Sequence, residues 1–149
     1  MIDYTLRGLT ADELSFKVNP MKVAPDTKFE IKPFFSRRIQ TAKENPKINV
    51  VILECKIETS EEAPKPFNMV VRLVGVFEVN NMETAEDRRI FALNATETMY
   101  PYLRATVSSL TTASFIAPLN LPVISGATLF PEDRSAEGFN VNFDPKNVN

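Results

Sequence analysis

Two long apolar segments joined by one short polar turn constrain the fold more than any other feature of the chain. Residues 48–58 (INVVILECKIE) and residues 66–79 (PFNMVVRLVGVFEV) are rich in the β-branched and aromatic residues that strands favour. One face of each segment is apolar, and part of the other face is apolar too. The turn between them, residues 60–65, is too short to cross over a sheet. We therefore expect two neighbouring antiparallel strands.

Two further strand patterns precede this pair. Residues 2–18 alternate between apolar and polar positions, with a break or bulge expected at Gly8 and at residues 10–13. Residues 29–36 alternate as well, although Pro33 favours an edge or irregular position. With the central pair, these patterns predict an antiparallel sheet of four strands.

The sequence period changes at residue 80 and becomes helical. Residues 80–110 begin with acidic side chains and continue with arginines, an order typical of a helix. Pro101 lies inside this stretch, so we expect a short helix near residues 84–93 and a second helix over about 96–113, with Pro101 in its first turns or at a kink. The predicted apolar stripe of the second helix comprises Met99, Leu103, Val107 and Leu110.

The remainder of the chain predicts one α+β domain. Its 149 residues are the usual size of a single domain, and neither internal repeats nor a domain-splitting linker interrupt them. Residues 125–149 are rich in charge, glycine and proline, but FNVNF at residues 139–143 alternates and predicts a short extra strand. We expect the domain to span residues 1–149.

The chain lacks the side chains on which most catalytic and metal sites depend. It has no histidine, four widely separated glycines and one cysteine, Cys55. It therefore offers no Ser-His or Cys-His pair and no glycine-rich phosphate loop. Carboxylate pairs at residues 61–62 and 132–133 lie in loop-like sequence, where charges are normally solvated. We expect a protein that is not an enzyme, with no catalytic residue, no metal site and no cofactor.

Charge and hydropathy limit the kinds of partner and the cellular location that we expect. The net charge is −2 and the basic residues are scattered, whereas nucleic acid requires a concentrated positive field. The first ten residues show no secretory signal pattern, and no apolar run approaches membrane-spanning length. We therefore expect a cytoplasmic protein that neither binds nucleic acid nor inserts into a membrane.

Several short motifs resemble one known family when their order is considered. Tyr100-Pro101-Tyr102-x-Arg104 lies in the predicted helix, and the apolar segment FIAPLNLPVI at residues 115–124 follows it. The remaining motifs are Leu119-Asn120-Leu121, Leu129-Phe130 and, near the start, Leu14-Ser15-Phe16. Over about residues 10–130 the chain resembles the SecB family of export chaperones, whereas residues 131–149 diverge from it.

This resemblance implies a fold and a function. SecB proteins have a four-stranded antiparallel sheet with helices on one face, and they assemble as dimers of dimers. They are ATP-independent chaperones that hold unfolded polypeptides, their clients, in apolar grooves. The connection between the first two strands and the loop after the long helix line these grooves. The residues that match these regions here are Met21, Val23, Phe29, Phe115, Ile116, Leu119 and Leu121.

The sequence leaves two alternatives open at this point. Phe115, Leu119 and Leu121 fit a proline-stiffened groove wall, but they fit equally well a loop that packs into its own core. The second alternative is an adaptor or assembly protein with the same fold that docks one specific partner instead of many clients.

The partnership with a SecA-type motor is also open. Family members that deliver cargo to this motor present acidic residues on the outer sheet face. Glu13 matches one of the acidic positions, but Val70 stands where the family has an acid in the fourth strand, and Lys17 stands where an acid is common. We therefore expect weak or absent binding to such a motor.

Overall fold

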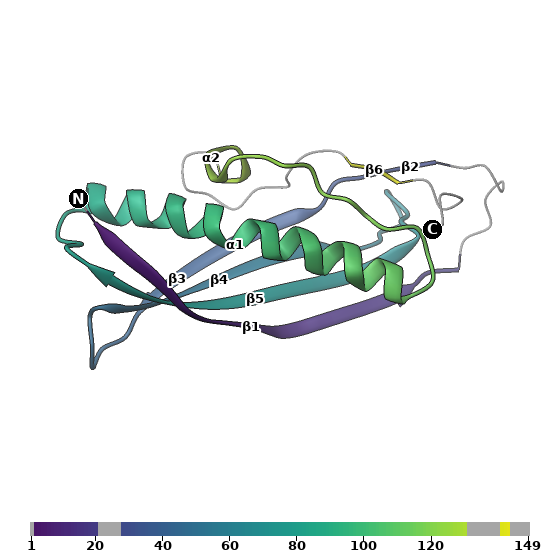
Figure 1. Ribbon diagram of the computed structural model, residues 1–149. Helices are drawn as coiled ribbons and strands as arrows, with labels where there is room; N and C mark the ends of the chain where they lie inside the picture. Colours follow the sequence, from purple (N-terminus) through teal and green to yellow (C-terminus); the bar gives the residue numbers. More distant parts are fainter. Residues whose placement is uncertain (1, 21–27, 131–140, 144–149) are drawn as a thin grey trace.

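The computed structural model describes residues 2–20, 28–130 and 141–143. Its main element is a four-stranded antiparallel sheet in the order β1-β5-β4-β3, and one long helix, α1, covers one face of this sheet (Figure 1). The predicted α+β fold, with four antiparallel strands and helix on one side, is therefore confirmed. The four strands are β1 (Asp3–Val18), β3 (Phe34–Thr41), β4 (Ile48–Ile57) and β5 (Phe67–Asn80).

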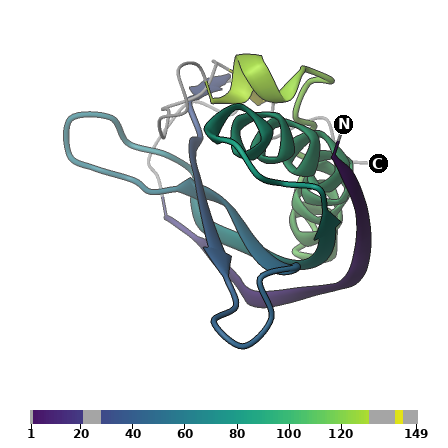
Figure 2. The same ribbon diagram turned by 90° about the vertical axis from the view of Figure 1, so that its left-hand side faces the viewer.

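β1 is irregular at the two places that the sequence predicts. Its register with β5 shifts between Leu6 and Gly8, and again between Ala11 and Glu13. Irregularities of this kind bend a strand and increase its twist. β1 accordingly curves up beside the helix in Figure 2, so that one strand borders both the sheet and α1.

The strand predicted over residues 29–36 is divided into two elements around Pro33. β2 (Phe29–Ile31) lies outside the main sheet, and β3 begins at Phe34. Because proline cannot donate to a strand ladder, the chain changes partners there. β2 pairs antiparallel with β6 (Val141–Phe143), which is the described part of the short strand predicted at residues 139–143.

Helix α1 runs without interruption from Ala85 to Ala113, so the prediction of two separate helices is wrong. Pro101 lies in its interior, where a proline costs about 3 kcal/mol or more. Both halves of the helix nevertheless pack on the same sheet, and each large buried side chain contributes roughly 1.5–3 kcal/mol. Packing on both sides of the proline therefore outweighs its cost. The buried residues at four-residue spacing are Phe91, Ala95, Met99, Leu103 and Val107.

The start of α1 is fixed by a reciprocal cap. The Asp87 amide donates to Thr84 Oγ1 over 3.0 Å, and Asp87 Oδ2 accepts from the amides of Glu83 and Thr84, each over 3.0 Å. These bonds satisfy amides that have no partner within the helix. They also lower the pKa of Asp87, because the hydrogen bonds from the backbone favour the charged carboxylate.

Helix α1 lies close to the sheet because one position opposite it has no side chain. A Cβ atom added to Gly75 of β5 would lie 2.9 Å from Met99 Sδ, which is closer than packed atoms approach. The absence of a side chain at Gly75 lets Met99 sit directly on the sheet. None of the described helices is both long and apolar enough to cross a membrane.

Candidate functional site

The segment after α1 runs back along the helix in an extended conformation, and side chains of the helix hold it there. Four polar residues of α1, spaced by three or four positions, face this loop. Their bonds run from Tyr100 Oη to the Pro122 carbonyl (2.7 Å), from Arg104 Nε to the Leu121 carbonyl (2.7 Å), from Ser108 Oγ to Asn120 Oδ1 (3.2 Å), and from the Leu119 amide to Thr111 Oγ1 (2.9 Å). We call residues 119–122 the tied loop.

The tied loop contributes to the core of the chain. Leu119 and Leu121 are fully buried, whereas Asn120 and Pro122 between and after them are exposed. This alternation is that of an extended segment with one face packed inward. Of the two alternatives that the sequence left open, the structure places Leu119 and Leu121 in the core, and neither side chain presents surface to a partner in this conformation.

The start of the same loop is different, because Phe115 points away from the core. Its side chain is 90% exposed, and its backbone adopts a φ of 61°, which a non-glycine residue rarely takes. The neighbouring Ile116 is half-buried against the core. Phe29 is half-buried in β2, whereas Met21 and Val23 lie outside the described residues. The structure therefore distributes the predicted groove residues between core, partly covered positions and one exposed aromatic ring.

The second half of β1 presents apolar side chains on the face of the sheet that carries the helix. Leu14, Phe16 and Val18, which we call the β1 strip, are in register with the buried residues Val71, Met69 and Phe67 of β5. Leu14 and Val18 are nevertheless 51% and 53% exposed, because α1 leaves this part of the edge strand β1 largely uncovered.

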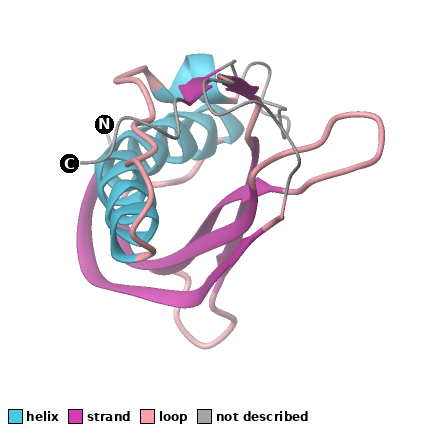
Figure 3. Ribbon diagram, turned by 90° about the vertical axis from the view of Figure 1, so that its right-hand side faces the viewer, coloured by secondary structure: helices cyan, strands magenta, loops and turns pink. Residues whose placement is uncertain are grey.

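The position of the β1 strip brings it close to the start of the loop. The C-terminal end of α1 lies beside this half of β1 in both side views (Figures 1 and 3), and Phe115 follows that end directly. Sequence periodicity predicted the inward face of β1 correctly, but it carries no signal for how far a helix extends over that face. The exposure of the strip is therefore apparent only in the structure.

The outer face of the sheet carries a cluster of ion pairs around Arg72. The guanidinium group lies 2.7 Å from the carboxylate of Asp12 and 3.3 Å from those of Glu13 and Glu54. These carboxylates raise the pKa of Arg72. Glu13, the residue that the resemblance assigns to motor binding, is thus already paired. The sequence did not indicate this cluster, because its members come from three strands and the shifted register of β1 decides which side chains meet.

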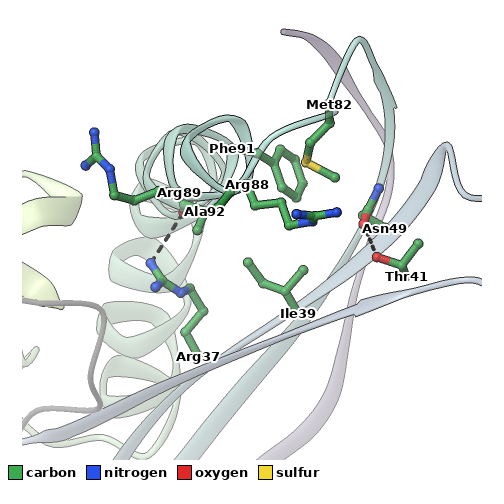
Figure 4. Close-up of a pocket in the computed structure, with 10 residues that line it drawn as sticks. Arg37, Ile39, Thr41, Asn49, Met82, Arg88, Arg89, Phe91 and Ala92 are labelled. Atoms are coloured by element: carbon green, nitrogen blue, oxygen red, sulfur yellow. Dashed lines mark hydrogen bonds between the residues drawn. The ribbon is translucent and has the colours of Figure 1, made fainter.

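A pocket of about 390 Å³ lies between the first turns of α1 and strands β3 and β4 (Figure 4). Arg37, Arg88 and Arg89 are among its lining residues, and its lining contains no carboxylate, cysteine or serine. Arg37 donates to the Thr96 hydroxyl over 2.9 Å and lies 4.8 Å above the ring of Phe130, so it links β3 to α1 and to the residue that follows the short helix α2 (Gly126–Leu129). Burial lowers the pKa of Arg37. The pocket has the character of a structural junction, and its one side-chain hydroxyl, that of Thr41, donates to Asn49 Oδ1 over 2.7 Å.

The described residues contain no cluster of side chains that would hold a metal ion, and Cys55 is fully buried in the core. Burial raises the pKa of the Cys55 thiol, so it stays protonated and unreactive at neutral pH. The chemistry that the described residues do offer is apolar contact along the β1 strip and Phe115.

A four-stranded antiparallel sheet, a long helix across one face and a loop returning along that helix define the SecB-like class of α+β folds. A family model described as preprotein translocase subunit SecB matches residues 11–137. The chain therefore belongs to the SecB family. This confirms the resemblance drawn from the motifs.

One solved structure supports the same fold assignment. It is the SecB-like chaperone Rv1957 of Mycobacterium tuberculosis in complex with a ChAD peptide from the HigA1 antitoxin. The two chains are 17% identical, the TM-score is 0.67, and the match covers 82% of this chain and 91% of the other. A comparison with curated protein sequences gives no significant match.

Proposed function

We propose that this protein is an ATP-independent chaperone that binds unfolded or partly folded polypeptides through the β1 strip and the exposed start of the loop. Membership of the SecB family supports a chaperone-like function. The observation that carries the proposal is the exposure of Leu14 and Val18 on the second half of β1, and of Phe115 just after the end of α1. Neighbouring exposed apolar side chains on a folded surface mark sites of interaction. Because burial of apolar area is non-directional, such a surface accepts many sequences.

The predicted client-binding residues keep different roles in this proposal. Phe115 and Ile116 contact clients directly, together with Phe29 and with Met21 and Val23, which lie outside the described residues. Leu119 and Leu121 instead support the surface from the core. Leu14 and Val18 join the site because of their exposure.

The alternative proposal is an adaptor with the same fold that docks a single protein partner. The comparison structure holds one antitoxin peptide, and a dedicated client of that kind would use the same apolar surface. The two proposals differ in breadth. A general chaperone prevents aggregation of unrelated unfolded proteins, whereas an adaptor co-purifies with one partner and leaves aggregation unchanged.

Substitution of Phe115 tests both proposals. The variant Phe115→Ser should weaken suppression of light scattering from a reduced, aggregating client by at least about threefold, because a large part of the exposed apolar area is lost. Its melting temperature should stay near that of the unaltered protein. Val123→Ser is the matched control, because Val123 is 81% exposed but lies about 20 Å further along the helix, beside Tyr100. Equal loss in both variants, or no suppression by the unaltered protein, would reject the chaperone proposal.

We also propose that the protein assembles as a dimer of dimers in the cytoplasm. One edge of β1 is sixteen residues long and has no neighbouring strand in the described part of the chain, and such edges favour pairing with another chain. The outward side of α1 carries small exposed residues, Ala105, Ser109 and Thr112, which allow close approach of a second helix. Light scattering that gives the 16.8 kDa mass of one chain would reject an assembly.

Binding to a SecA-type motor should be weak. Glu13 is paired with Arg72, and Val70 replaces the second acidic position, so the outer face presents fewer unpaired carboxylates to attract such a partner. The variant Arg72→Gln releases Glu13 and two further carboxylates and should strengthen motor binding. Micromolar or tighter binding by the unaltered protein at physiological salt would contradict the proposal.

A further inference from the structure

A second extended segment packs on the helix side of the sheet, and it comes from the end of the described chain. β6 pairs antiparallel with β2, with Phe143 opposite Phe29 and Val141 opposite Ile31. Val141 and Phe143 are both buried. The Phe143 ring meets the Phe67 ring edge-on at 5.4 Å.

The pairing of β2 with β6 is short, so its side chains provide most of the attachment. Three residues of each strand form a two-stranded sheet that is separate from the main one, and an isolated two-stranded pairing is marginal in water. The two buried side chains are spaced by two positions: Phe143 packs on the aromatic ring of Phe67, and Val141 is buried opposite Ile31. What β2 and Phe67 accept here is therefore an extended segment with apolar residues at positions i and i+2.

The place that β6 occupies is continuous with the exposed apolar surface. Phe67 stacks on Phe16 of the β1 strip at 5.1 Å between ring centroids. Phe143 thus covers one side of a ring whose other neighbour belongs to the proposed client surface. Departure of β6 would uncover Phe67 and one edge of β2, and would extend the β1 strip toward Phe29.

We propose that β2 and Phe67 form a strand-addition site for an extended polypeptide with apolar side chains two residues apart, and that β6 occupies this site as an internal competitor. This inference rests on the proposed function and names the class of segment that the chaperone takes. A client adds its backbone to β2, as peptides do at other exposed strand edges, and places its apolar side chains where Val141 and Phe143 lie. Because β6 is tethered, its effective concentration is about millimolar, so only clients with several contacts displace it.

A peptide-binding experiment tests the site without any client. A labelled synthetic peptide with the sequence of residues 139–145 should bind the double variant Val141→Ser/Phe143→Ser at least about tenfold more tightly than the unaltered protein, whose site is filled. The control peptide carries serine at the two apolar positions and should bind neither protein. Equal affinity of the unaltered peptide for both proteins would overturn the inference.

A second experiment, hydrogen exchange, uses the unaltered protein and so does not depend on how the variant folds. Addition of an unfolded client should accelerate hydrogen exchange in residues 141–143 at least about fivefold, while residues 29–31 stay protected by the client's own backbone. If the client binds and residues 141–143 keep their protection, the strand-addition inference fails and the chaperone proposal stands. If no client binds at all, the chaperone proposal fails, and the peptide-binding experiment alone decides whether the site exists.

Discussion

Two extended segments lie on the helix side of the molecule, and they are held in opposite ways. The tied loop is bonded to α1 by four side chains, and its leucines complete the core. β6 is bound to β2 by a three-residue pairing and by two apolar side chains. Four hydrogen bonds from side chains of α1 fix the first segment, whereas a short backbone pairing and apolar side chains hold the second. The first segment is therefore part of the scaffold, and the second is exchangeable.

Removal of the leucine side chains of the tied loop should have the largest effect on stability. The double variant Leu119→Ala/Leu121→Ala should lose much of its stability, because each buried leucine truncated to alanine costs about 2–5 kcal/mol. Urea unfolding should show this loss, and Val123→Ala should stay within about 0.5 kcal/mol of the unaltered protein as the exposed control. A double variant of nearly normal stability would mean that the tied loop is not core.

A smaller effect is expected when one of the hydrogen bonds between α1 and the tied loop is removed. In Tyr100→Phe the Pro122 carbonyl loses its donor, which should cost about 0.5–1.5 kcal/mol of unfolding free energy. Burial raises the pKa of Tyr100, so the hydroxyl is protonated and donates throughout the physiological range. Tyr102→Phe is the matched control, since Tyr102 is exposed on the same helix. Equal stability of the two variants would show that packing alone holds the loop.

The smallest effect concerns the start of α1, the helix to which the tied loop is bonded. The pKa of Asp87 is lowered in the folded protein, so its carboxylate stabilises the fold above the unfolded-state pKa of about 3.9, and this contribution is lost as the pH falls through the lowered folded-state pKa. Asp87→Asn should therefore be less stable than the unaltered protein at pH 7, and the difference should shrink below about pH 4. Urea titrations at pH 7 and pH 3 measure this. A difference that is independent of pH would contradict the assigned cap.

Much of the scaffold was accessible from the sequence, and the reason is periodicity. β4 and β5 alternate in burial along their whole length, as the apolar pattern indicated, and the irregularities of β1 coincide with Gly8 and residues 10–13. Pro101 misled the prediction of the helix, because local propensity does not include packing that continues on both sides of a proline. Helix continuity depended on tertiary contacts.

The functional surface was less accessible, since it depends on which side chains meet across the fold. The motif of Tyr100 and Arg104 identified the family, but its role in bonding the loop requires the loop's course. The pairing of Glu13 with Arg72 requires the register of β1. The exposure of Leu14 requires the limit of the area that α1 covers. None of these follows from residue spacing along one segment.

Hydrogen exchange of individual amides tests the central contrast most directly. We expect that the Leu119 amide, which donates to Thr111 Oγ1, exchanges only through global unfolding, with a protection free energy equal to that from urea titration. The amides of residues 141–143 should exchange through a local opening of much lower free energy and should lose protection first in sub-denaturing urea. If β6 and the tied loop opened together, with the same free energy and the same dependence on urea, the distinction between a fixed and an exchangeable segment would be wrong.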